Sequence, residues 1–215
     1  MSLEVVFAGP RKGSDRAVLL AHGAGSDMHA RTLTTVADAL TAAGVPSLRF
    51  NFPYRTAGKT APDRAPVLEA ATRAAVGELA RRTGLDITRL VVGGRSMGGR
   101  YCSLVVAGDD EPIPALGLVL LGYPLHPAGR PDRLRVDHFP RLHLPVLFVS
   151  GTRDALAPQA ALKDGARAIP GPVSVQWLDT ADHGFRPLKR SGLTRARVLE
   201  DAAEATVRFV AGLPG

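Results

Sequence analysis

The feature that most constrains this chain is the regular alternation of short apolar runs with longer stretches of helical periodicity. This alternation is typical of strands joined by helical crossovers, so it predicts an α/β fold with a mostly parallel sheet. Two runs, ALGLVLLG (115–122) and LPVLFVSG (144–151), are almost entirely apolar, and we expect them at the centre of the sheet. The full set of predicted strands is 3–8, 17–21, 46–52, 88–94, 115–122, 144–151 and 173–178.

The predicted helices are marked by their boundaries as well as by their apolar spacing. The stretch 29–44 ends at Gly44, a residue type suited to helix C-termini. In 63–83, Pro66 suits a first helical turn, and the apolar stripe stops before Gly84. The remaining predicted helices cover 97–108, 159–169 and 194–211.

Length and composition narrow the class of protein. With 215 residues and 45% hydrophobic residues, the chain suits one domain, residues 1–215, with one well-filled core. No apolar stretch is long enough to cross a bilayer, and the N-terminus is unlike a signal peptide. Cys102 is the single cysteine, which excludes an internal disulfide, and we give it only a packing role. A cytoplasmic protein fits these observations best.

The net charge of +7 raises the question of a nucleic-acid partner. However, 23 of the 27 basic residues are arginines scattered from Arg11 to Arg208, with no long run. Nucleic-acid recognition surfaces usually cluster their charge. We therefore expect a solvated basic surface and no nucleic-acid partner.

The stretch VVGGRSMGGR (91–100) contains the pattern G-x-S-x-G around Ser96, between a predicted strand and a predicted helix. A serine at such a junction sits on a tight, strained turn that exposes its hydroxyl and requires small neighbours. The competing interpretation is a glycine-rich loop that only packs a helix on the sheet. The stretch matches neither nucleotide-binding glycine pattern. It therefore favours a nucleophilic serine.

A serine nucleophile needs a histidine base and a carboxylate, in the chain order serine, acid, histidine on this kind of fold. His183, in TADHGF, is the one histidine after the last predicted strand. Asp154 follows LPVLFVSG, where strand C-termini converge. Asp179 and Asp182 are too close to His183 in sequence. Further rivals for the acid are Asp132 and Asp137, and a helix-capping role is the alternative for Asp154.

The same reaction needs backbone N–H groups to stabilise the negative charge on the carbonyl oxygen. The turn His22-Gly23-Ala24-Gly25 follows the strand 17–21, and its glycines leave the backbone accessible. We expect the amides of Ala24 and Met97 to form this oxyanion hole. A plain strand-to-helix turn is the alternative for this segment.

Six blocks together carry a family resemblance: AHGAGSDM, LRFNFPYR, GGRSMGGR, LGYPLHPAGRPDRLR, FVSGTRDALA and ADHGF. The chain resembles an α/β-hydrolase. More narrowly, it is similar to a small dienelactone-hydrolase-like family that includes a testis-expressed protein and a subunit of a chromatin-associated acetyltransferase complex. The resemblance implies a three-layer αβα sandwich without a lid domain. It also implies a catalytic triad of Ser96, Asp154 and His183.

Several residues near the predicted site suit contacts with the substrate. Arginine forks bind carboxylate or phosphate, so we hypothesise an acidic group on a small acyl substrate. The alternative is that these arginines form ion pairs within loops. The candidates are Arg95, Arg55, Tyr123 and His126, with Arg49 and Arg130 on neighbouring loops.

These patterns predict a serine hydrolase that cleaves a small ester or thioester through an acyl-enzyme, without a cofactor. A metal site at His126, His138 and His143 is not expected, because they lack a recognised ligand spacing. The alternative function is a non-catalytic α/β-hydrolase-like module for protein interaction.

Overall fold

The computed structural model describes residues 3–215 and contains one seven-stranded sheet in the order β1-β3-β2-β4-β5-β6-β7. All neighbouring strands are parallel except β1 and β3, which are antiparallel. The predicted, mostly parallel α/β sheet is therefore confirmed. The strands are β1 (Val5–Ala8), β2 (Ala17–Ala21), β3 (Ser47–Phe50), β4 (Leu90–Arg95), β5 (Gly117–Leu121), β6 (Val146–Gly151) and β7 (Val173–Leu178).

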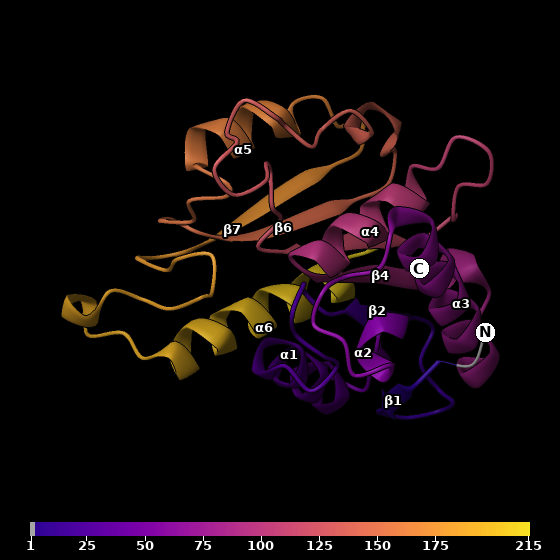
Figure 1. The fold of residues 1–215 in the computed structure, drawn as a ribbon. Helices are drawn as coiled ribbons and strands as arrows, with labels where there is room; N and C mark the ends of the chain where they lie inside the picture. The colour runs from indigo at the N-terminus through magenta and orange to yellow at the C-terminus, as the bar shows by residue number, and fades with distance from the viewer. Residues whose placement is uncertain (1–2) are drawn as a thin grey trace.

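Helices cover both faces of this sheet, as Figure 1 shows. One face is packed by α1 (Arg31–Ala42) and α6 (Arg195–Ala211), and the other by α3 (Ala65–Thr83), α4 (Met97–Val106) and α5 (Gln159–Ala166). A short helix, α2 (Pro53–Thr56), was not predicted. The result is the three-layer αβα sandwich that the resemblance implied. Helices α1 and α3 are followed by Gly44 and Gly84, both with the left-handed backbone that favours glycine (φ 75° and 72°).

The position of the apolar strands in the sheet differs from the prediction. The central strand is β4, β5 lies beside it, and β6 is one strand from the edge. All residues of β5 and β6 are nevertheless buried, because helices cover this part of the sheet on both faces. A continuous apolar run thus indicates that a strand is buried on both faces of the sheet. It does not indicate where the strand lies in the strand order.

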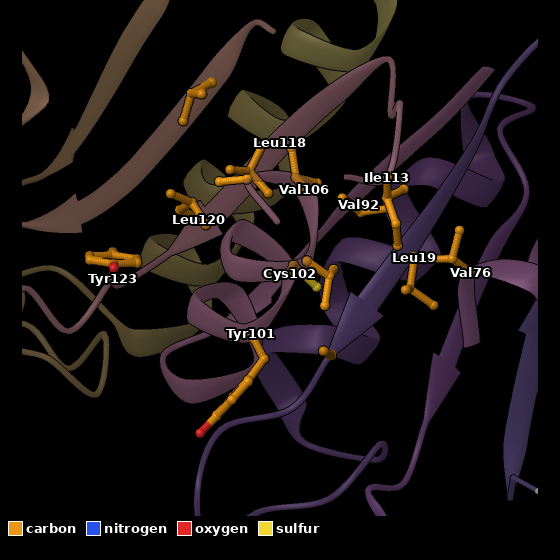
Figure 2. Close-up of a cluster of buried hydrophobic side chains, with 14 of the residues drawn as sticks. Leu19, Val76, Val92, Tyr101, Cys102, Val106, Ile113, Leu118, Leu120 and Tyr123 are labelled. Atoms are coloured by element: carbon orange, nitrogen blue, oxygen red, sulfur yellow. The ribbon is translucent and has the colours of Figure 1, made fainter. Parts of the chain in front are cut away.

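A hydrophobic cluster between α4 and the sheet fixes the helix that follows Ser96. Figure 2 shows Cys102 in this cluster beside Leu19 and Val92. The Cys102 thiol lies 3.2 Å from the Gly93 carbonyl oxygen, and burial raises its pKa to about 12. These contacts agree with a packing role for Cys102.

The connection from β5 to β6 is irregular and carries no lid among residues 3–215. It contains one short 3-10 turn, Phe139–Arg141, and packs inward through Leu125, Phe139 and Leu142. The carboxyl ends of the central strands are therefore not covered by an additional helical layer. In residues 3–215, no helix combines the length and the apolar character needed to cross a membrane.

Candidate active site

Ser96 occupies the turn between β4 and α4 with a backbone that L-amino acids rarely adopt (φ 49°, ψ −113°). Its amide donates a hydrogen bond of 2.9 Å to the Leu121 carbonyl and so anchors the turn to β5. A Cβ atom at Gly94 or at Gly98 would collide with the carbonyl oxygen of Ala21 on β2. The glycines on either side of Ser96 thus allow β4 and α4 to lie directly against β2.

The structure brings the three predicted catalytic residues together from three separate loops. The Oγ atom of Ser96 lies 3.0 Å from Nε2 of His183. On the other side of the imidazole, Nδ1 lies 2.8 Å and 3.0 Å from the two carboxylate oxygens of Asp154. A carboxylate only accepts hydrogen bonds, so Nδ1 carries the proton and Nε2 of the neutral ring accepts from the serine.

Asp154 is buried, and its environment fixes its orientation. One of its oxygens also accepts a 2.8 Å hydrogen bond from the Leu156 amide. The rival acids have other partners: Asp182 accepts from the amides of Gly184 and Arg186, and Asp179 accepts from the Thr180 amide. The geometry therefore places Asp154, and neither of these two, behind the imidazole.

The loop that carries His183 is held between two strained residues, Thr180 (φ 54°) and Phe185 (φ 57°). The Thr180 amide donates to the Thr152 hydroxyl at 2.8 Å, which ties this loop to the one that carries Asp154. The Arg153 amide donates to the Ala181 carbonyl at 2.9 Å. These contacts fix the position of the His183 loop relative to the Asp154 loop.

Arg95 was predicted as a substrate contact, and in the structure its guanidinium binds backbone carbonyls of the protein. Its guanidinium donates to the backbone carbonyls of Leu121, Gly122 and His183 and stacks on the Phe185 ring, 4.7 Å from the centroid. Burial lowers its pKa to about 10, so it remains charged near neutral pH. Arg95 is therefore a positioning residue that holds the His183 loop against β5, with both terminal nitrogens of its guanidinium bound to backbone carbonyls.

The predicted oxyanion donors lie beside the nucleophile. Ala24 and Met97 line the same cavity as Ser96, and within residues 3–215 neither amide donates a hydrogen bond to the protein. The preceding His22 is buried, and burial lowers its pKa, so the ring is neutral. Its Nε2 accepts from the Phe52 amide at 3.1 Å, so Nδ1 donates to the Gly23 carbonyl at 2.8 Å. His22 thereby orients the turn that carries Ala24, a role the sequence analysis missed.

The cavity beside Ser96, which we call the Ser96 pocket, has a volume of about 330 Å³. Of the four predicted substrate contacts, His126 lines this cavity, and Arg95 lines a second cavity that Ser96 also borders. Much of the lining is apolar: Leu68, Met97, Tyr101, Pro124, Pro127 and Leu156. Two further lining residues, Arg100 and Arg135, were not predicted.

Tyr123 and Arg55 do not line the Ser96 pocket. Tyr123 is buried and donates its hydroxyl hydrogen bond to the Arg135 carbonyl at 2.6 Å. Arg55 donates to the Lys59 carbonyl and lies 3.8 Å from the Asp27 carboxylate. Of the neighbouring arginines, Arg49 is buried and donates to the Met28 carbonyl, and Arg130 is exposed outside the pocket. The sequence order alone did not show the direction of these side chains.

A second cavity of about 410 Å³ is lined by Arg95, Ser96 and His183, among other residues. It shares Ala24 and Ser96 with the first cavity, and exposed arginines at its rim give it a basic character. We call it the arginine-rimmed pocket; these arginines are Arg31, Arg186 and Arg195. Ser96 therefore lines two cavities, one mainly apolar and one basic.

The three histidines considered as a metal site have separate partners. Nδ1 of His126 lies 2.9 Å from the Pro127 carbonyl, and Nε2 of His138 lies 2.8 Å from the Ser103 hydroxyl. His143 is exposed. In the described part of the chain, no three His, Cys, Asp or Glu side chains are grouped to hold a metal ion.

A helix-covered, mostly parallel sheet with a serine on a strained turn after its central strand defines the α/β-hydrolase class. The chain belongs to this family, since the family model for the alpha/beta hydrolase domain matches residues 14–211.

Solved structures of low sequence identity share the fold. A dienelactone hydrolase from Anabaena variabilis is 22% identical with a TM-score of 0.75, covering 99% of this chain and 93% of its own. An alpha-beta serine hydrolase homologue from Coxiella burnetii is 21% identical with a TM-score of 0.72, covering 96% and 90%. A serine hydrolase without a lid from Xanthomonas campestris is 22% identical with a TM-score of 0.68, covering 99% and 90%.

Proposed function

We propose that this protein is a serine hydrolase that cleaves a small ester or thioester through an acyl-enzyme. The observation that carries the proposal is the continuous chain of contacts from the Ser96 hydroxyl through His183 to Asp154. Hydrogen-bonded nucleophile, base and orienting acid are the arrangement that activates a serine. The serine hydrolases with a similar fold support the same class of reaction.

In the first half of the proposed reaction, the Ser96 oxygen attacks the acyl carbonyl while Nε2 of His183 takes the hydroxyl proton. The amides of Ala24 and Met97 donate to the oxyanion of the tetrahedral intermediate. Asp154 stabilises the imidazolium that forms. When the intermediate collapses, the bond to the leaving alcohol or thiol breaks and the leaving group takes the proton from His183.

In the second half, water attacks the acyl-enzyme and passes a proton to His183. The bond between the acyl carbon and the Ser96 oxygen then breaks, and the serine recovers its proton. The product is a carboxylic acid. The Ser96 pocket, at about 330 Å³ and without a lid, suits a small acyl group.

Short acyl esters and thioesters test this proposal, with Ser96→Ala compared to Ser103→Ala. Ser103 is a suitable control because it lies on the same helix and also contacts a histidine, yet it is fully buried. We expect Ser96→Ala to lose hydrolysis and folded Ser103→Ala to retain it. If the folded wild type hydrolyses none of these substrates, the site serves a binding role and the alternative of an interaction module takes precedence.

A further inference from the structure

Two arginines in the Ser96 pocket have no carboxylate partner among residues 3–215, and the Arg100 guanidinium lies over the Tyr101 ring, 5.4 Å from its centroid. Arg100 and Arg135 are both half-buried and line the same cavity as the nucleophile. Among residues 3–215, neither guanidinium donates a hydrogen bond or forms an ion pair with a carboxylate. The Arg100 Nε atom is fully buried and has no partner. This differs from Arg95, whose guanidinium is bound by three carbonyls.

The two charges also act on each other. Burial lowers the pKa of Arg135, and the nearby charge of Arg100 lowers it further. The cavity holds one carboxylate, Asp63, which accepts a 2.9 Å hydrogen bond from the Tyr54 amide. Two like charges beside an apolar wall are costly unless an anion neutralises them. Such a pair is expected where a ligand supplies the missing negative charge.

The position of Arg100 relates this charge to the reaction. Ser96 and Arg100 are four residues apart at the start of α4, and the Arg100 amide donates to the Ser96 carbonyl at 3.0 Å. One helical turn is about 5.4 Å, so Arg100 lies on the face of α4 that carries the nucleophile. Arg135 reaches the same cavity from the segment between β5 and β6.

We infer that the acyl group carries a second carboxylate, bound by Arg100 and Arg135, so that the substrate is a monoester or monothioester of a short dicarboxylic acid. This inference rests on the proposed function for the reaction at Ser96. The apolar lining contacts the carbon spacer, and the two guanidiniums bind the distal carboxylate. The arginine-rimmed pocket is then left on the leaving-group side of the nucleophile.

The first test compares two S-ethyl thioesters of equal chain length, that of glutaric acid with a free carboxylate and that of pentanoic acid. Hydrogen bonds to a charged group contribute enough to expect a kcat/KM for the glutaryl thioester about 10- to 100-fold higher. Arg100→Met and Arg135→Met should each reduce this preference. Arg167→Met should preserve it, because Arg167 is exposed just after α5 and does not line the Ser96 pocket. Equal kcat/KM values in the wild type would overturn the inference, as would a preference lost in Arg186→Met and retained in Arg100→Met.

A second measurement separates the binding site from the chemistry. Calorimetry with Ser96→Ala should show that glutarate binds about 10- to 100-fold more tightly than glutaramide, its neutral diamide of equal chain length. Binding of glutarate that Arg100→Met abolishes supports the anion site even if no thioester is hydrolysed. Hydrolysis of the pentanoyl thioester by the wild type, without glutarate binding, leaves the proposed function standing and refutes the anion site.

Thermal unfolding distinguishes a ligand site from a structural role. Removal of an unneutralised charge should leave the melting temperature of Arg100→Met and Arg135→Met equal to or above that of the wild type. Glutarate should raise the melting temperature of the wild type and not that of the two variants. A large loss of stability in both variants, with no glutarate effect on the wild type, would assign the arginines to the scaffold.

Discussion

The role of Arg95 gives a prediction that separates the structure from the sequence-based hypothesis. If Arg95 positions the His183 loop, Arg95→Met should destabilise the protein and lower kcat. If Arg95 binds an acidic substrate, as its place beside Ser96 had suggested, the change should mainly raise KM for anionic substrates. The two roles therefore affect different measurements.

The expected magnitude follows from the contacts of the guanidinium. It donates to three carbonyls, and each hydrogen bond from a charged donor contributes about 1.5–3 kcal/mol. The fall of its pKa to about 10 indicates that burial offsets about 3 kcal/mol of this gain. Loss of the side chain should lower the free energy of unfolding by about 2–5 kcal/mol, because three carbonyls would lose a charged hydrogen-bond donor.

Chemical denaturation of the wild type and of Arg95→Met measures this difference. The slope of unfolding free energy against denaturant concentration should be the same for both proteins. Arg167→Met is the matched control, because Arg167 is exposed and pairs only with Asp164 at the surface. A loss below about 1 kcal/mol, the scale of an exposed pair, together with a raised KM would refute the positioning role.

Three further predictions concern the turn, the triad and pH. Gly98→Ala should cost about 3 kcal/mol or more in unfolding free energy, because its Cβ would meet the Ala21 and His22 carbonyls. Gly77→Ala, at an exposed position of α3, should be neutral or stabilising by up to about 1 kcal/mol. Equal effects would contradict the packing argument. Asp154→Asn should lower kcat about 10⁴-fold with little change in KM, and near-normal kcat would remove Asp154 from the proposed triad. Burial and the charges of Arg100 and Arg141 lower the pKa of His138 from 6.5 to about 4. Between these two pH values, His138 therefore binds a proton in the unfolded chain and not in the folded protein. The free energy of unfolding should therefore fall by up to about 3 kcal/mol as pH drops from about 6.5 to about 4. Denaturation curves at several pH values should show a weaker pH dependence in His138→Gln. The exposed control His143→Gln should keep the dependence of the wild type.

The sequence predicted those parts of the molecule that depend on backbone pattern and chain order. The seven strands, the five longer helices and the turn at Ser96 follow from apolar periodicity and glycine placement. Asp154 and His183 were found because residues at the carboxyl ends of parallel strands converge. The structure shows that His183 contacts Ser96 and that Asp154 contacts His183. Their catalytic role remains a prediction.

The parts that the sequence could not predict depend on side-chain direction. Arg95 is the last residue of β4 and Tyr123 follows β5, yet both side chains bind backbone carbonyls inside the protein. Arg100 could have been found from its spacing of four residues after Ser96 on a predicted helix, which places the two on one face. Arg135 lies in an irregular segment, where no periodicity indicates which residues face the site.

The most direct test of the central claim is reaction of the folded protein with a fluorophosphonate, which forms a covalent bond only with an activated serine oxygen. Trypsin cleavage after Arg95 and Arg100 releases a peptide in which Ser96 is the single serine. Mass spectrometry should find the adduct on this peptide in the wild type, find it in Ser103→Ala, and find none in His183→Ala. A folded wild type without the adduct, or with it on another peptide, would contradict the account.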